Sequence, residues 1–231
     1  MNAPSAGQKR RPFTKWINFA VSPGGGGSQT LPPFIFTCRR YPVRVIAFNG
    51  SPRVGGNTEI LLASALKGID RQKHEVETFS LNDMNIKPCQ NCGGCSETGV
   101  CVVDNKMQQI YPAIRGADRI ILASPIYFLG LSAQTKAMID RCQPFWCEKY
   151  LLKRPLEKGE HRHGLLLLVG GMKRQTGVDC SSATATAFFR TTSVPEHKTL
   201  SYLGIDRKGA IKDHPSALHD AYEAAKKLTT P

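Results

Sequence analysis

The chain has 231 residues, of which 41% are hydrophobic and 21% are charged, so it can form one full α/β domain with a sizeable core. Its longest purely apolar run, Leu165–Val169, is far too short to cross a bilayer, so no membrane segment is expected. The formal net charge is +13, but residues 1–44 hold seven basic residues and no acid, and the remaining 24 basic and 18 acidic residues leave only +6. A mildly basic body without a basic stripe interleaved with aromatic residues argues against nucleic-acid binding.

Residues 1–42 are expected to be a disordered, basic, Pro/Gly-rich extension that precedes a folded domain over residues 43–231. Within the extension, Arg10-Arg11-Pro12-Phe13-Thr14-Lys15 is similar to a twin-arginine export signal. The apolar stretch that follows, Trp16–Val21, is shorter than a normal signal core and ends in Pro-Gly rather than at a cleavage site. A disordered tail, or a start codon assigned too far upstream, is therefore the preferred interpretation, and the protein is expected to be cytoplasmic.

Strand and helix patterns alternate along the rest of the chain. Strands are predicted at Val43–Asn49, His74–Leu81, Arg119–Ala123, Leu165–Val169 and Thr199–Leu203. Helices are predicted at Thr58–Gly68, Asp104–Arg115, Ser132–Cys142, Asp179–Arg190 and Pro215–Leu228. Such alternation implies right-handed crossovers and a parallel sheet with helices on both faces. The predicted fold is α/β: a flavodoxin-like, doubly wound, five-stranded parallel sheet in a three-layer α/β/α arrangement, which binds ligands at the carboxyl ends of its strands.

The first predicted strand runs directly into the loop Gly-Ser-Pro-Arg-Val-Gly-Gly-Asn-Thr at residues 50–58, and a helix follows. Backbone N–H groups of such a loop, with the helix dipole behind them, form a phosphate site. The loop lacks the Lys of a Walker motif and the glycine spacing of a Rossmann dinucleotide site, so a terminal monophosphate such as that of FMN fits better. An ordinary Gly/Ser turn is the alternative. The expected phosphate ligands are Ser51, Arg53, Asn57 and Thr58.

Four of the eight cysteines are crowded into a predicted loop at residues 88–103. They are Cys89, Cys92, Cys95 and Cys101, in the pattern C-x2-C-x2-C-x5-C. The x2 spacing is usual for a [4Fe–4S] cluster, whereas zinc sites typically separate two cysteine pairs by a longer finger. A disulfide framework is typical of small secreted domains, and free thiols without metal are the remaining alternative. No Ser/His/Asp set or carboxylate pair stands out, so no catalytic side chain is assigned.

The loop at residues 50–58, the segment Ala-Ser-Pro-Ile-Tyr-Phe at residues 123–128 and the following run at residues 132–141 resemble the flavodoxin-like NAD(P)H-dependent FMN reductase family, including its iron–sulfur flavoproteins. The resemblance extends from about Val45 to Leu228 and implies that the Pro-x-Tyr-Phe segment holds the flavin ring. A weaker match at residues 169–173 implies a flavin contact at Gly171, although the family often has a small or hydroxyl residue where Met172 stands. The implied ring-binding residues are Pro125, Ile126, Tyr127, Phe128 and Gly171.

The resemblance implies an FMN-dependent oxidoreductase or electron-transfer flavoprotein that couples FMN to a [4Fe–4S] cluster, because the family's iron–sulfur members carry a compact cysteine run after the second strand. FMN exchanges one or two electrons, and a cluster exchanges one. The implied partners are a ferredoxin-like electron carrier or NAD(P)H as donor, and the implied assembly is a homodimer or homotetramer. Two alternatives stay open: an NAD(P)H-dependent FMN or quinone reductase without a cluster, and a zinc-stabilised flavodoxin-like binding module.

Overall fold

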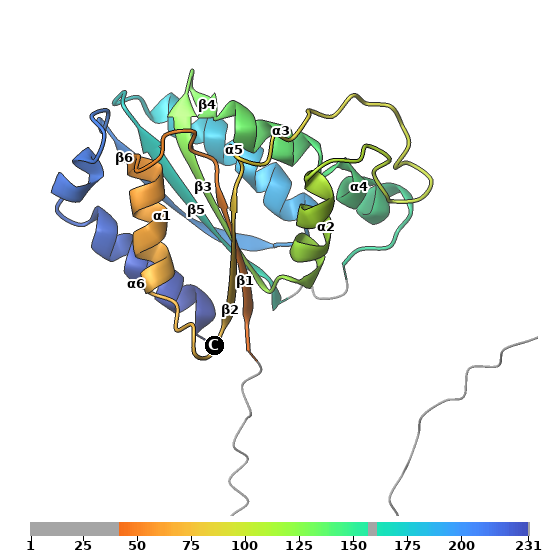
Figure 1. Ribbon diagram of the computed structural model, residues 1–231, viewed down its shortest axis with the longest axis horizontal. Coiled ribbons are helices and arrows are strands. Elements are labelled where there is room, and N and C mark those ends of the chain that lie inside the picture. Colours follow the sequence, from red (N-terminus) through yellow and green to blue (C-terminus); the bar gives the residue numbers. More distant parts are fainter. Residues whose placement is uncertain (1–41, 157–160, 231) are drawn as a thin grey trace, which may run out of the picture. The chain divides into compact units, whose positions relative to one another are not determined.

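Five parallel strands build the central sheet of the computed structural model (Figure 1), which describes residues 42–156 and 161–230. The strands pair in the order β2-β1-β3-β5-β6, so the chain steps outward from β1 to β2, returns to β3 and continues to β6. They are β1 (Arg44–Asn49), β2 (Glu75–Ser80), β3 (Arg119–Tyr127), β5 (His163–Gly170) and β6 (Glu196–Leu203). This doubly wound parallel sheet confirms the predicted fold class. The predicted extension and its arginine pair lie outside the described residues, apart from Pro42.

Helices cover both faces of the sheet, as Figure 1 shows. The longer ones are α1 (Asn57–Lys67), α2 (Met107–Gly116), α3 (Ala133–Asp140), α5 (Gln175–Thr191) and α6 (Ala217–Thr229). Successive strand residues point to opposite faces. Val45 and Ala47 of β1 therefore pack with α1 and α6 on one face, and Ile46 and Phe48 pack with α2 and α5 on the other. The two apolar clusters give the three-layer arrangement that the alternating pattern predicts.

The structure extends β3 beyond its predicted end at Ala123 to Tyr127. Pro125 lies inside this strand, although proline is rare in a central strand because it lacks an N–H donor. The pairing explains the exception: β1 ends at Asn49, which is in register with Ala123, so β3 has no β1 neighbour beyond that point. Pro125 pairs in register only with Val169 of β5.

Four short elements were not predicted. They are the two-residue strand β4 (Gly130–Leu131), the helix α4 (Gln143–Trp146), the π-helix η1 (Cys147–Leu151) and the 3-10 helix η3 (Ala210–Asp213). Each is too short to carry a recognisable hydrophobic period. Within the two described ranges, every helix is too short or too polar to traverse a lipid bilayer.

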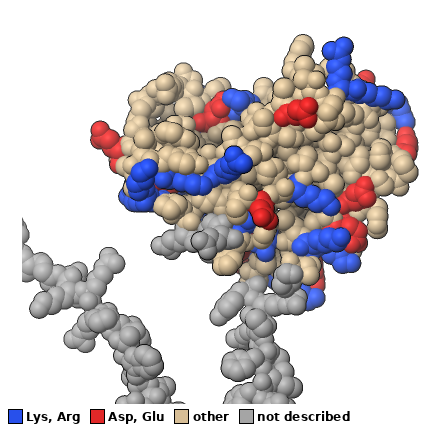
Figure 2. All heavy atoms as spheres, turned by 180° about the vertical axis from the view of Figure 1, so that it is seen from behind, with Lys and Arg blue, Asp and Glu red and all other residues tan. Residues whose placement is uncertain are grey.

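Acidic side chains lie among the Lys and Arg side chains on the face of the molecule shown in Figure 2. The described part of the chain also carries exposed ion pairs such as Arg44–Glu75 (3.1 Å) and Lys136–Asp140 (2.8 Å). Such pairs contribute about 1 kcal/mol or less to stability. The mixture agrees with the small charge excess of the chain beyond residue 44.

Arg162, which precedes β5, is buried and uses its guanidinium to close the ends of two helices. It donates to the carbonyls of Ile114 and Ala117 at the end of α2, the latter at 2.8 Å, and to Thr192 after α5. Burial lowers the pKa of Arg162 to about 10, so the side chain still carries its charge at neutral pH. A cation at a helix C-terminus is favourable because the free carbonyls there carry partial negative charge.

Replacing Arg162 by Met should lower the free energy of unfolding by about 3 kcal/mol, because several buried carbonyls lose their donors at once. Urea unfolding of the full-length protein, followed by circular dichroism, measures this. Arg207→Met removes an exposed ion pair with Asp213 and serves as the control, with an expected change below about 1 kcal/mol. Equal losses in the two variants would contradict the role given to Arg162.

Candidate functional site

The loop after β1 is held against β3 and α3 by a close backbone contact at Gly50. The Gly50 N–H donates to the Ala123 carbonyl (2.8 Å), and the Gly50 carbonyl accepts from Ser132 Oγ (2.6 Å). A Cβ atom at position 50 would lie 1.8 Å from Thr135 Oγ1. Only glycine therefore fits, because a packed interior leaves no room for the extra atom.

Three buried hydroxyl groups form the other side of this contact. The Ser132 and Thr135 hydroxyls lie 2.9 Å apart, and Thr135 Oγ1 lies 3.3 Å from Ser124 Oγ. Ser132 also caps α3, because its Oγ accepts from the Thr135 N–H at 3.3 Å. Every hydroxyl in the set has a partner, as buried polar groups require. None of the three was predicted as a site residue; a Ser just before the first turn of a helix is the sequence signal for such a cap.

The predicted phosphate loop turns tightly and is largely buried. Ser51 Oγ accepts from the Arg53 N–H (3.2 Å), and the Gly56 N–H donates to the Arg53 carbonyl (2.9 Å). A Cβ atom at Gly56 would lie 2.8 Å from that carbonyl oxygen. The Gly55 N–H donates to the carboxylate of Glu59 (2.7 Å), so one amide of the loop already holds an oxyanion. The amides of Gly50, Ser51, Arg53, Gly55 and Gly56 are thus all engaged within the protein, and these bonds fix the shape of the loop.

Two of the predicted ligands connect the loop to the segment after β6. The Asn57 side chain donates to the Arg207 carbonyl (2.9 Å) and accepts from the Ile211 N–H (3.3 Å). The exposed Arg53 guanidinium donates to the Asp206 carbonyl (3.3 Å). Asn57 therefore fixes the loop through both the nitrogen and the oxygen of its side-chain amide. Arg53 uses only one guanidinium nitrogen in a hydrogen bond to the described residues.

A cleft of about 910 Å³ opens at the carboxyl ends of β3, β5 and β6. It lies beside the loop, because Asp206 lines the cleft and also accepts from Arg53. Four of the five predicted ring-binding residues line it: Ile126, Tyr127, Phe128 and Gly171. The fifth, Pro125, is buried within β3. The cleft is also lined by residues that sequence reasoning did not assign: Leu129, Leu131, Ala133, Lys136, Gly170, Met172, Arg174, Gly177, Leu203 and Asp206.

One wall of the cleft is a tight hairpin formed by β3 and β4. Ile126 pairs with Leu131 and Tyr127 pairs with Gly130, which leaves Phe128 and Leu129 as the turn. Both turn residues have positive φ angles, 47° and 64°. Left-handed backbone of this kind suits a two-residue hairpin turn but costs about 1–2 kcal/mol for a residue other than glycine. The Phe128 side chain is fully exposed at the rim.

Ser51 faces a different, shallower hollow of about 380 Å³ between α1 and the end of β2. The structure therefore brings four of the predicted ring-binding residues together in one cleft and places the predicted phosphate loop at its border through Arg53, while Thr58 lies buried at the start of α1. The loop and the cleft meet at the carboxyl edge of the sheet, which is where a doubly wound fold binds its ligands.

The cysteine-rich loop at residues 88–103 is closed by Arg141, which follows α3 and is buried. Its guanidinium donates to the Lys87 and Val103 carbonyls, both at 3.0 Å, and lies 3.4 Å from Cys101 Sγ. One side chain thus holds the two ends of the loop together and places a positive charge beside one of its thiols. Sequence reasoning gave Arg141 no role, because its partners lie 54 and 38 residues away in the chain.

The four predicted metal ligands line one small cavity together with Arg141, Gln143 and Pro144. Cys92 is exposed, and Cys89, Cys95 and Cys101 are half-buried. Cys95 Sγ lies 3.7 Å from Sγ of the buried Cys147 in η1. Among the residues that the structure describes, no three His, Cys, Asp or Glu side chains lie close enough together to hold a metal ion.

The thiols of the loop differ in their electrostatic surroundings. Burial, followed by the neighbouring Cys147 thiol, raises the pKa of Cys95 well above its usual value. Burial also acts to raise the pKa of Cys101, but the Tyr111 hydroxyl, the Val103 amide and the Arg141 guanidinium outweigh it and lower that pKa. Cys101 is therefore the thiol that this environment most favours in its thiolate form, the form that binds metal.

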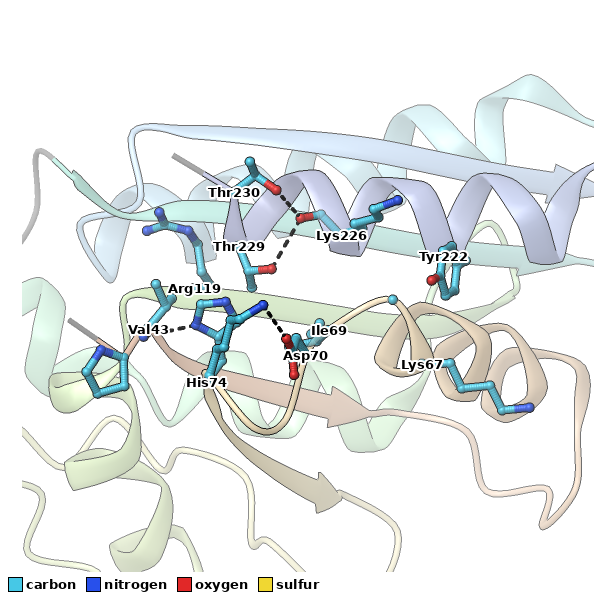
Figure 3. Close-up of a pocket in the computed structure, with 13 residues that line it drawn as sticks. Val43, Lys67, Ile69, Asp70, His74, Arg119, Tyr222, Lys226, Thr229 and Thr230 are labelled. Carbon is cyan, nitrogen blue, oxygen red and sulfur yellow. Dashed lines mark hydrogen bonds and ion pairs between the residues drawn. The ribbon is translucent and has the colours of Figure 1, made fainter. Parts of the chain in front are cut away.

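A second hollow, of about 660 Å³, lies at the opposite edge of the sheet, near the starts of β1 and β3 (Figure 3). Its polar groups are engaged with the protein: the Val43 N–H donates to His74 Nδ1 (3.3 Å), and Asp70 pairs with Lys73 (2.8 Å). Arg119 donates to the Leu228 carbonyl (2.5 Å). None of the predicted site residues lines this hollow.

Comparison with known proteins identifies related sequences. The sequence profile of the family described as NADPH-dependent FMN reductase matches residues 43–201. An iron–sulfur flavoprotein of Methanocaldococcus jannaschii is 42% identical over 44% of this chain and 53% of its own length. Another, of Methanosarcina thermophila, is 34% identical over 57% of this chain and 65% of its own length. The matches therefore span about half to two thirds of these curated relatives.

The fold is shared with solved structures at low sequence identity. An NAD(P)H:quinone oxidoreductase from Methanothermobacter marburgensis matches 82% of this chain and 96% of its own, with a TM-score of 0.60 and 15% identity. An FMN-dependent NADH-azoreductase from Bacillus anthracis, solved in complex with FMN, matches 81% of this chain and 100% of its own, with a TM-score of 0.56 and 13% identity. At such identities the likeness concerns the fold.

Gly50→Ala should lower the free energy of unfolding by about 2 kcal/mol or more, because the added methyl group overlaps the Thr135 hydroxyl and forces the loop away from α3. Urea unfolding measures the loss. Gly130→Ala is the matched control: its Cβ atom would meet only the Tyr127 carbonyl oxygen at 3.9 Å, so a change within about 0.5 kcal/mol is expected. A Gly50→Ala variant as stable as this control would show that the close contact with Thr135 does not restrict the side chain at position 50.

Proposed function

The chain belongs to the NADPH-dependent FMN reductase family, and on this premise we propose that it is a flavin-dependent oxidoreductase that binds FMN in the cleft at the carboxyl ends of β3, β5 and β6. We propose further that the cysteine-rich loop carries a [4Fe–4S] cluster. The observation that carries the proposal is the exposed Arg53 guanidinium of the loop after β1 at the border of a cofactor-sized cleft, at the carboxyl edge of the sheet.

The residues present fit FMN. Gly50 and Gly56 are positions where a Cβ atom would collide with the protein, so glycine lets the loop fold tightly against β3 and α3 and fixes its shape. The cleft volume of about 910 Å³ falls within the range of about 300–1,000 Å³ that is usual for small-molecule and cofactor sites. One wall offers the aromatic rings of Tyr127 and Phe128, and another offers the backbone of Gly171.

In this proposal the protein binds and orients the cofactor. The Ser51 and Thr58 hydroxyls and the Arg53 guanidinium hold the phosphate, and Asn57 keeps the loop in place through the segment after β6. Ile126, Tyr127 and Phe128 hold the ring, with Pro125 fixing the end of β3 behind them. When bound, FMN supplies hydride and single-electron transfer. No side-chain acid or base is assigned.

The donor set of the cysteine-rich loop fits an iron–sulfur cluster. Four thiols at C-x2-C-x2-C-x5-C spacing border one cavity, and thiolates are the ligands such clusters take. Gly93 and Gly99 have positive φ angles, and a Cβ atom at Gly93 would meet nothing within 4 Å, so this part of the loop has room to bring the thiols together. The Arg141 charge would offset the charge of the thiolates. Relatives named iron–sulfur flavoproteins support the same assignment.

The alternatives predict different compositions for the purified protein. A cluster-free NAD(P)H-dependent FMN or quinone reductase would contain flavin without iron, and a zinc-stabilised binding module would contain zinc without flavin. Iron, acid-labile sulfide and flavin analysis of anaerobically purified protein distinguishes the three. We further propose NAD(P)H or a ferredoxin-like carrier as electron partner and a homodimer or homotetramer as the assembly, in a cytoplasmic protein.

Arg53→Ala should weaken FMN binding about tenfold, which corresponds to the loss of one charge-assisted hydrogen bond to phosphate. Quenching of flavin fluorescence on titration into flavin-free protein gives the dissociation constant. Arg71→Ala, which removes an exposed guanidinium from the connection between α1 and β2, should leave the constant unchanged. If both variants bound FMN as the parent does, the phosphate would lie elsewhere.

Cys92→Ser should abolish the cluster and leave FMN in place, because Cys92 belongs to the thiol set but does not line the flavin cleft. Iron and sulfide content per flavin measures the effect. Cys180→Ser, at an exposed cysteine of α5, is the control and should retain full iron content. Unchanged iron in Cys92→Ser would contradict the assignment of this thiol as a ligand.

A further inference from the structure

The closest approach of two thiols among the described residues lies between the cysteine-rich loop and η1. Cys95 Sγ is 3.7 Å from Cys147 Sγ, although the two residues are 52 positions apart in the chain. Cys147 is 1% exposed, whereas Cys95 is half-buried and reachable from solvent. Cys147 is not one of the four cysteines with cluster spacing, and the proposed function gives it no role.

We infer that Cys95 and Cys147 form a reversible disulfide in the cluster-free protein, and that this bond withholds Cys95 from the cluster. The first half stands on the thiol pair alone; the second rests on the proposed function, since it requires Cys95 to be a cluster ligand. The disulfide and the cluster then exclude one another, so the oxidation state of this pair decides whether the loop can take up iron and sulfide.

The surroundings favour closure of this bond. A disulfide requires the sulfurs to approach to about 2.05 Å, so one thiol must move by somewhat under 2 Å. Cys147 is fixed inside η1, where its carbonyl accepts from the Leu152 N–H (2.9 Å). Cys95 begins a turn closed by a bond from the Gly99 N–H to its own carbonyl (2.9 Å), and the open space beside Gly93 lets that turn shift.

The other thiols of the loop have different neighbours. Cys89 Sγ accepts from the Asn91 N–H (3.4 Å), and Cys101 Sγ faces the Arg141 guanidinium (3.4 Å). The buried Cys142 contacts Met138. Within the described ranges, Cys95 and Cys147 are therefore the two cysteines that the fold places close enough to form a disulfide after a small shift.

The oxidation balances with a small disulfide such as oxidised glutathione as the oxidant. The accessible Cys95 thiol gives up its proton and attacks one sulfur of that disulfide, which breaks the S–S bond and releases one glutathione thiolate. Cys147 then gives up its proton and attacks Cys95 Sγ in the mixed disulfide, which forms the internal S–S bond and expels the second glutathione. Two protein thiols lose two electrons and two protons, and one small disulfide becomes two thiols.

The test uses the full-length protein after removal of iron by a chelator under reducing conditions. We expect incubation with oxidised glutathione, followed by alkylation, proteolysis and tandem mass spectrometry, to give a peptide pair linked through Cys95 and Cys147. Dithiothreitol should release it. Cys180→Ser should give the same linkage, and Cys147→Ala, which keeps a small side chain in the buried position, should give glutathione on Cys95 instead. Linkage of Cys95 to Cys92, or no linkage at all, would overturn the inference.

A second measurement separates this inference from the proposed cluster. The reduced parent protein and the reduced Cys147→Ala variant should take up equal amounts of iron and sulfide on reconstitution. The parent protein with the Cys95–Cys147 disulfide should take up at least tenfold less until dithiothreitol is added. Iron loss in reduced Cys147→Ala would make Cys147 a ligand and contradict mutual exclusion. If no form takes up iron while the linkage forms, the disulfide stands and the cluster proposal fails.

Discussion

The contact between Gly50 and the hydroxyls of Ser132 and Thr135 determines how the two halves of the site meet. The carbonyl of Gly50 accepts from Ser132, and its missing side chain leaves room for Thr135. Because Ser132 and Thr135 also bond to Ser124, a single buried network fixes the loop after β1, the end of β3 and the start of α3. The donors of the loop and the wall of the cleft are therefore set by one local arrangement at the carboxyl edge of the sheet.

Two buried arginines show a common way of joining distant segments. Arg162 binds carbonyls at the ends of α2 and α5, and Arg141 binds carbonyls at both ends of the cysteine-rich loop. In both cases the planar guanidinium has enough donors to satisfy several carbonyls at once. The cost of burying the charge is offset by these hydrogen bonds rather than by a single carboxylate partner. The ends of the two helices and the two ends of the cysteine-rich loop are thus held by the same kind of hydrogen bond.

The sequence predicted the sheet well because buried parallel strands leave continuous apolar runs, as in β5, and because helix periodicity is strong in α2 and α6. The cleft was predicted in part, through the motif at residues 125–128. Other features depend on contacts between residues far apart in the chain. Arg141 and the pair of Cys95 and Cys147 could not be assigned because nothing in the local sequence marks their partners.

The hairpin of β3 and β4 was missed for a different reason. Two-residue hairpin turns are usually recognised by Asn or Gly, and here Phe128 and Leu129 occupy the left-handed positions. Likewise, the predicted strand ended at Ala123, two residues before Pro125, and only the register of β1 shows why a proline is tolerated inside β3. In both places the tertiary arrangement overrides a reliable local preference.

The same hairpin has a consequence for binding. A short turn closed by paired strands leaves Phe128 few backbone conformations, so its aromatic ring is presented at the rim before any ligand arrives. The backbone conformational entropy of the hairpin is lost when the chain folds rather than when a ligand binds in the cleft. A flat ligand would therefore meet a backbone that is already fixed, and only the side-chain rotation of Phe128 would remain to be lost on binding.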